Sequence, residues 1–299
     1  MPRSNAQRRA VAGCALGAML LSGCQSSAPQ AISSRPAVSP HATPSPAPAI
    51  SRPAVVSGDD GITVTLFPAA KGGWEAARMV VDQRLVMIRW HPGTVVPGGT
   101  GWSAPDTLTA RERATVLATF NAGFTNTGSR GGTREGNRVH GRLRPGAATL
   151  LIDRTGRANV RAYDPVRDAS VPVARQNLDL LVDGGRPAPT VGQDDSRVWG
   201  NTLHHRHATY RSGVGITARG FLVVIVADRV TTAQLATLLV QAGAVRAMEL
   251  DINPQFVCLL TYTHVGGRVT PHRVLPRQQG SLYRYLGPSR RDFFSVGPR

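Results

Sequence analysis

Two stretches near the C-terminus decide the fold: GVGITARGFLVVIVAD, residues 213–228, and AVRAMELDIN, residues 244–253. The first consists of two apolar runs around a short Ala-Arg-Gly link, which predicts a β-hairpin. Between the two stretches, TTAQ at 231–234 has the spacing of a capping box, and apolar residues then recur on one helical face as far as Gly243. The predicted order is therefore strand, hairpin, strand, helix, strand.

The last of these strands carries two carboxylates, Glu249 and Asp251, two residues apart. Side chains alternate along a strand, so both carboxylates are expected on the same side. Like charges this close repel and tend to raise one pKa, which is typical of a site that handles protons or cations. Pro254 cannot donate to a sheet ladder, so the backbone is expected to leave the sheet there. The pair should then lie at the mouth of a strand, where ligands collect in α/β sheets.

Strand-like runs dominate the chain after residue 57. They lie at residues 62–67, 78–82, 85–90, 114–120, 147–163 and 178–186, in addition to the two stretches above. A second hairpin is expected at residues 153–156, and capping-box spacing from Thr109 to Glu112 predicts a short helix. We therefore predict one α+β domain over residues 58–299, with mixed, mostly β core sheets flanked by a few helices.

The N-terminus has the pattern of an exported lipoprotein. Arginines precede an apolar stretch that is too short to span a bilayer, and it ends in LSGC, which resembles a lipobox. Residues 1–23 are therefore predicted to be a signal peptide, and Cys24 to be lipidated. Residues 24–57, rich in Pro, Ala and Ser, are predicted to form a disordered linker. The expected location is the extracytoplasmic face of the cell membrane; the alternative is an ordinary secretory signal with a chance cysteine.

The charge and the cysteines restrict the partners and the covalent cross-links that the sequence allows. The formal net charge of +17 would ordinarily suggest a nucleic-acid partner, but Lys71 is the only lysine and the arginines are scattered singly. Because no aromatic stacking face accompanies them, we predict no nucleic-acid binding. Cys258 is the only cysteine after Cys24, so no disulfide is expected within the mature domain. In FVCLLTY it has the setting of a buried strand residue.

Other segments offer candidate site residues, each with a simpler alternative. In TFNAGFTN, Asn121 could bind a sugar or phosphate or form an Asx turn, and Gly123 permits close approach of backbone or ligand. In the Gly- and Arg-rich loop that follows, Arg130 is suited to an anion, or is an ordinary surface arginine. Arg211, just before a strand, could hold a phosphate or be a solvated charge. His205 in HHRH is suited to substrate binding or is an exposed loop histidine, because the spacing matches no standard zinc motif.

Three segments together resemble the motifs of the phosphodiester glycosidase family. They are ATFNAGF at 118–124, YRSGVGITARGFLVVIVAD at 210–228 and GAVRAMELDINPQF at 243–256. The likeness runs from about Thr115 to the C-terminus, and the closing PSRRDFFSV is similar to actinobacterial lipoprotein-type members. Asn121, Arg211 and Asp251 fall on the family's Asn, Arg and Asp.

The chain also departs from the family pattern. Ala122 replaces a family glycine, and Glu249 stands where many members have Asn. Ile252-Asn253-Pro254 replaces a Gly-rich turn, which would have presented backbone N–H groups to an anion.

The resemblance implies a hydrolase that cleaves sugar-1-phosphodiester bonds of envelope or extracellular glycans. Asp251 would act as nucleophile or base, and Glu249 would shift protons or hold sugar hydroxyls. Arg211 would neutralise the phosphate while Asn121 orients the sugar. The residues assigned to substrate binding are Gly123, Asn253, Arg130 and His205.

Several alternatives remain open for this site. No cofactor or metal is assigned, although the Glu249–Asp251 pair could hold a divalent cation. The pair could also do no more than cap neighbouring backbone amides. A different class of function is a non-catalytic lipoprotein that binds cell-wall glycan on the same scaffold.

Overall fold

The computed structural model describes residues 54–299, apart from residues 60, 68–74, 194–195 and 203–205. Contacts divide the chain into Met1–Thr43 and Pro44–Arg299, and the described residues all belong to the second unit. The predicted signal peptide, Cys24 and His205 lie outside the described residues, so these predictions stay untested. None of the helices in the described part of the chain is both long enough and apolar enough to cross a membrane.

Three antiparallel sheets make up the described part of this unit. The eight-stranded sheet has the spatial order β1 (Ala54–Asp59), β2 (Ile62–Phe67), β3 (Glu75–Val81), β14 (Leu222–Val230), β13 (Thr209–Thr217), β15 (Ala244–Glu249), β11 (Leu180–Asp183) and β12 (Arg186–Pro187). One five-stranded sheet has the order β7 (Arg138–His140), β6 (Thr133–Glu135), β10 (Val173–Gln176), β8 (Ala148–Ile152) and β9 (Ala158–Ala162). The other has the order β17 (Arg268–Arg273), β16 (Leu259–Val265), β5 (Ala118–Asn121), β18 (Phe293–Pro298) and β4 (Val86–His91).

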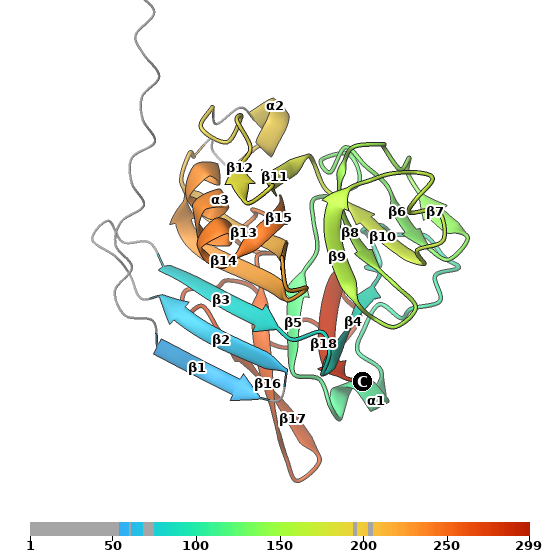
Figure 1. Ribbon diagram of the computed structural model, residues 1–299. Helices are drawn as coiled ribbons and strands as arrows, with labels where there is room; N and C mark the ends of the chain where they lie inside the picture. The colour runs from blue at the N-terminus through green and yellow to red at the C-terminus, as the bar shows by residue number, and fades with distance from the viewer. Residues whose placement is uncertain (1–53, 60, 68–74, 194–195, 203–205) are drawn as a thin grey trace, which may run out of the picture. The chain divides into compact units, whose positions relative to one another are not determined.

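Strand β14 contributes side chains to two apolar clusters, one on each of its faces. It is buried on both faces, which explains its nearly continuous apolar sequence. Leu222, Val224 and Val226 belong to a cluster with side chains from β4, β5, β8 and β18. Val223 and Ile225 alternate to the other face and belong to a second cluster, with the apolar side of helix α3 (Thr232–Gln241). In Figure 1, the eight-stranded sheet and the β6–β10 sheet flank β4, β5 and β18.

The helix starts predicted from sequence are confirmed. Helix α1 (Ala110–Arg113) begins after Thr109 and α3 after Thr231, and both N-termini have complete capping boxes, closed by Glu112 and Gln234 respectively. The third helix, α2 (Ser196–Trp199), was not predicted from the sequence. Both predicted hairpins are also present, as β8–β9 and β13–β14.

The α+β, mostly β class is confirmed, but two details differ from the prediction. Every strand pair among the described sheets is antiparallel, although mixed sheets were expected. The reason is that α3 connects β14 to β15 across β13, so β14 and β15 run parallel without pairing. The ordered strands also begin at Ala54 rather than at residue 58, because β1 pairs with β2.

Candidate active site

The backbone of Asp251 is held just beyond the end of β15. Its N–H donates to the carbonyl of Ala122 at 3.1 Å, and its carbonyl accepts from the backbone N–H and the hydroxyl of Ser212 at 3.2 and 2.7 Å. These hydrogen bonds tie the residue to β13 and to the end of β5, two strands that come from distant parts of the chain. The carboxylate is therefore carried on a rigid support.

Asp251 is only 4% exposed as a residue, yet it lines a pocket of about 270 Å³. One carboxylate oxygen accepts from the backbone N–H of Asn253 at 2.9 Å, and the other forms an ion pair with Arg291. Burial raises the pKa of the Asp251 carboxyl, while Arg291 acts in the opposite direction. The pocket lining consists of Phe124, Thr125, Gly128, Gly200, Asn201, Asp251, Ile252, Asn253 and Arg291.

Arg291 is the site residue that the sequence reasoning missed. Its guanidinium also donates to the carbonyl of Gly123 at 3.0 Å and lies 4.5 Å from the ring centroid of Phe256. Arg291 belongs to the PSRRDFFSV stretch, but nothing in its local pattern indicates a partner forty residues earlier. The aspartate is thus paired with an arginine from just before β18, whereas Arg211, the arginine predicted to neutralise the phosphate, is paired with Glu249.

Glu249 and Arg211 form a separate buried ion pair. The Arg211 Nη1 to Glu249 Oε1 distance is 2.7 Å, and the two side chains are 3% and 0% exposed, respectively. Arg211 also donates from Nε to the carbonyl of Val230 at 3.1 Å. Neither residue lines the Asp251 pocket. Within the described residues, the two carboxylates predicted to share one site therefore each have an arginine of their own.

Asn121 is fully engaged in holding strands together. Its amide donates to the carbonyl of Ala122 and to the hydroxyl of Ser212, at 2.8 and 2.9 Å. Its carbonyl accepts from the N–H of Cys258 at 2.9 Å. Because Ser212 in turn holds the backbone of Asp251, Asn121 acts on the site through positioning. It does not line the pocket.

The residues assigned to substrate binding have different surroundings. Asn253 lines the pocket, and its side chain accepts from the N–H of Gln255 at 2.9 Å. Gly123 allows close packing, because a Cβ there would lie 2.8 Å from the side chain of Asn177. Arg130 lies outside the pocket lining and donates to the carbonyls of Arg197 and Val198, both at 2.8 Å.

A divalent cation does not fit the donor set of the predicted carboxylate pair. Glu249 and Asp251 are each ion-paired with an arginine, which already supplies the positive charge that a metal would bring. In the described part of the chain, no group of three or more His, Cys, Asp or Glu side chains could hold a metal ion.

Residues 114–251 match the model of the phosphodiester glycosidase family. The match ends at Asp251 and includes β5, β13 and β15, the strands that support the pocket. The family that this segment matches is the one that the sequence motifs indicated.

Comparison with solved structures gives partial likenesses. The zebrafish N-acetylglucosamine-1-phosphodiester alpha-N-acetylglucosaminidase catalytic domain, auto-inhibited by its pro-peptide, is 16% identical, with 81% of this chain and 85% of that chain covered and a TM-score of 0.49. A hypothetical protein from Synechocystis is 12% identical, with 80% and 62% covered and a TM-score of 0.46. A search of curated proteins found no match.

Proposed function

We propose that this protein hydrolyses sugar-1-phosphodiester bonds, with Asp251 and Arg291 at the reacting centre. The observation that carries the proposal is that this ion pair lines a pocket at the end of the family-matched segment. A carboxylate beside a guanidinium suits the two charges of such a substrate. The phosphate needs a cation, and the anomeric carbon becomes positive in the transition state.

Arg291 would bind the phosphate. Its fork of N–H donors matches phosphate oxygens, and a phosphate monoester is stable as a leaving group without added protons. In the reaction, the bond from the anomeric carbon to the phosphate oxygen breaks and a bond to a water oxygen forms. The phosphate monoester leaves with the bonding electron pair, and the proton of the water passes to the carboxylate, directly or after a covalent intermediate.

Substrate binding would also change Asp251. The anionic phosphate competes with Asp251 for Arg291, and a carboxylate that loses its cation partner becomes more basic. Burial already raises the pKa of Asp251, so the freed carboxylate is suited to act on the anomeric centre as base or nucleophile. Glu249 and Arg211 would act indirectly in this scheme, by fixing the ends of β15 and β13.

The proposed substrates are glycans of the cell envelope. The support is the N-terminal sequence pattern, in which an apolar signal ends in LSGC and a Pro-rich linker follows. Lipidation of Cys24 would keep the domain at the extracytoplasmic face of the membrane. If Cys24→Ser still partitions with membranes after peripheral proteins are removed, this part of the proposal is wrong.

The test of the catalytic proposal is hydrolysis of glucose 1-(methyl phosphate) by the purified full chain, measured as released glucose with and without a chelator. Asp251→Asn is nearly isosteric and should lower kcat by about a hundredfold or more. Asp183→Asn is the matched control, because Asp183 is exposed and outside the pocket. Equal turnover by wild type and Asp251→Asn would place the chemistry elsewhere.

A second function, glycan binding without catalysis, is favoured by two observations. The turn after Asp251 contains Pro254, and Asp251 is already neutralised by Arg291 in the resting structure. In that case the wild type should bind envelope glycan saturably while releasing no sugar from any phosphodiester. Arg291→Gln should then weaken binding, because the anion loses its cation, and turnover by wild type would exclude this function.

A further inference from the structure

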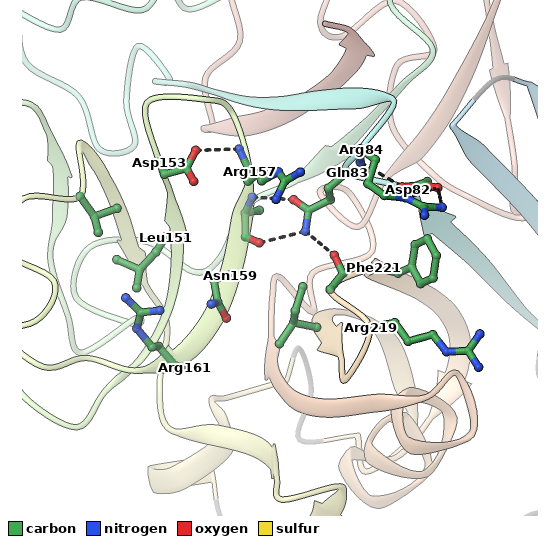
Figure 2. Close-up of a pocket in the computed structure, with 14 residues that line it drawn as sticks. Asp82, Gln83, Arg84, Leu151, Asp153, Arg157, Asn159, Arg161, Arg219 and Phe221 are labelled. Carbon is green, nitrogen blue, oxygen red and sulfur yellow. Dashed lines mark hydrogen bonds and ion pairs between the residues drawn. The ribbon is translucent and has the colours of Figure 1, made fainter.

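A second pocket, of about 850 Å³, lies between three turns of the chain. Its walls come from the β3–β4 turn, the β8–β9 hairpin and the β13–β14 hairpin (Figure 2). Gln83 joins these walls, because its side chain donates to the carbonyls of Ala158 and Gly220 at 3.0 and 2.9 Å. It also accepts from the N–H of Ala158 at 2.6 Å. The pocket is therefore held open by hydrogen bonds within the fold.

One wall of the pocket is a polar row along β9 and the residue before it. Arg157, Asn159 and Arg161 are two residues apart, so their side chains are expected on one face of the extended chain. The alternate residues Ala158 and Val160 are buried in the main core. The alternation of RANVR thus builds a rigid strip of donors and acceptors along the pocket, as Figure 2 shows.

The lining has more positive charge than its own aspartates neutralise. Of its four arginines, Arg84 is paired with Asp82 at 2.6 Å, and Arg161 donates to the buried Asp168. The side chains of Arg157 and Arg219 make no hydrogen bond or ion pair within the described residues. These two cations are available to an anion that enters the pocket.

Other lining groups suit a polyhydroxylated molecule. The Asn159 Oδ1 atom is buried and has no hydrogen-bond partner among the described residues, which is costly unless a donor reaches it. Phe221 adds an apolar ring to the lining, next to Arg84. A volume of about 850 Å³ is in the range of small-molecule sites, which combine apolar surface with a few placed polar groups.

This pocket is separate from the one at Asp251. The two linings share no residue. They also lie toward opposite ends of β13, because Ser212 contacts Asp251 while Ile216 lines the second pocket. Four residues of strand between these positions span about 13 Å, so one monosaccharide cannot fill both.

We propose that this pocket is a second binding site, for a saccharide that carries an anionic group. Arg157 and Arg219 supply the positive charge that attracts the anion, and Asn159 accepts a hydrogen bond from a sugar hydroxyl. The site does not depend on the proposed hydrolysis, since none of its residues belongs to the Asp251 pocket.

The test is isothermal titration of the full chain with glucose 6-phosphate, inorganic phosphate and glucose. The titrations are run on the wild type and on Arg291→Gln. The variant lacks the cation of the Asp251 pocket, so binding that it retains is assigned to the second pocket. Glucose 6-phosphate should bind saturably to both proteins. The double variant Arg157→Gln/Arg219→Gln should weaken this binding at least tenfold, equivalent to about 1.4 kcal/mol. Arg154→Gln is the matched control, an exposed arginine of the same turn outside the lining, and should change the affinity less than twofold.

Asn159→Leu tests the saccharide part. It should weaken glucose 6-phosphate binding several-fold and leave phosphate binding unchanged, because only the sugar loses its acceptor. Three results would overturn the proposal: no saturable binding, equal affinity of the double variant and the wild type, or glucose binding as tightly as glucose 6-phosphate. If phosphate alone bound as tightly as glucose 6-phosphate, the saccharide assignment would be wrong.

Discussion

Replacing Arg175 with methionine should destabilise the domain strongly, because it leaves Asp292 as a buried charge. The Arg175 and Asp292 side chains are 1% and 0% exposed, and the Nε to Oδ2 distance is 2.6 Å. Arg175 also donates to the carbonyls of Gln176 and Phe124 at 2.6 and 2.7 Å. After the substitution, the hydrogen bond from Trp90 at 3.2 Å remains as a partner of the carboxylate.

Breaking one side of a buried ion pair typically costs about 3–5 kcal/mol, which is a large share of the stability of a domain. The measurement is urea unfolding of the full chain followed by tryptophan fluorescence, with the shift in midpoint compared at constant m. The double variant Arg175→Met/Asp292→Asn should recover much of the loss, because the uncompensated charge is gone. Arg84→Met is the matched control, since Arg84 is 75% exposed and solvent screens its ion pair with Asp82, so the urea midpoint should change little.

Two results would refute this reasoning. One is a decrease of less than about 1 kcal/mol in the free energy of unfolding for Arg175→Met. This would mean that other groups stabilise the Asp292 carboxylate. The other is a double variant no more stable than the single one, which would assign the loss to packing and to the two carbonyl contacts.

Three further predictions concern local features. Gly123→Ala should lower the thermal midpoint, with a cost of about 1–3 kcal/mol, because its Cβ would lie 2.8 Å from Asn177; an unchanged midpoint would contradict this. Thr231→Ala should cost about 1 kcal/mol in urea unfolding by removing the N-cap of α3, whereas Thr237→Ala, inside that helix, should cost less. Burial raises the pKa of Cys258 to about 11, so at pH 8 only about one thiol in a thousand is ionised. Alkylation at this cysteine, located by mass spectrometry, should therefore require unfolding, and rapid labelling of the native chain would contradict its burial.

Local signals in the sequence were sufficient to predict much of the secondary structure. The capping boxes at Thr109 and Thr231 depend on residues three positions apart, and the hairpin turns on a few consecutive residues. Apolar, strand-like runs identified β2 and β15, because such residues suit a half-buried or buried sheet surface. The same signals, with the order of motifs, were enough to indicate the family whose model matches residues 114–251.

The pairing of charges was decided only by the tertiary structure. Sequence spacing placed Glu249 and Asp251 together, but β13 supplies Arg211 to the first and the segment before β18 supplies Arg291 to the second. Likewise, the RANVR row on β9 becomes the wall of a pocket only because the β3–β4 and β13–β14 turns meet it. A side chain's partner across such distances is set by strand order and register, which are properties of the whole sheet. The sequence by itself determined which residues are charged, which are suited to burial and which form turns. The packing of three sheets against one another determined which of these residues are in contact.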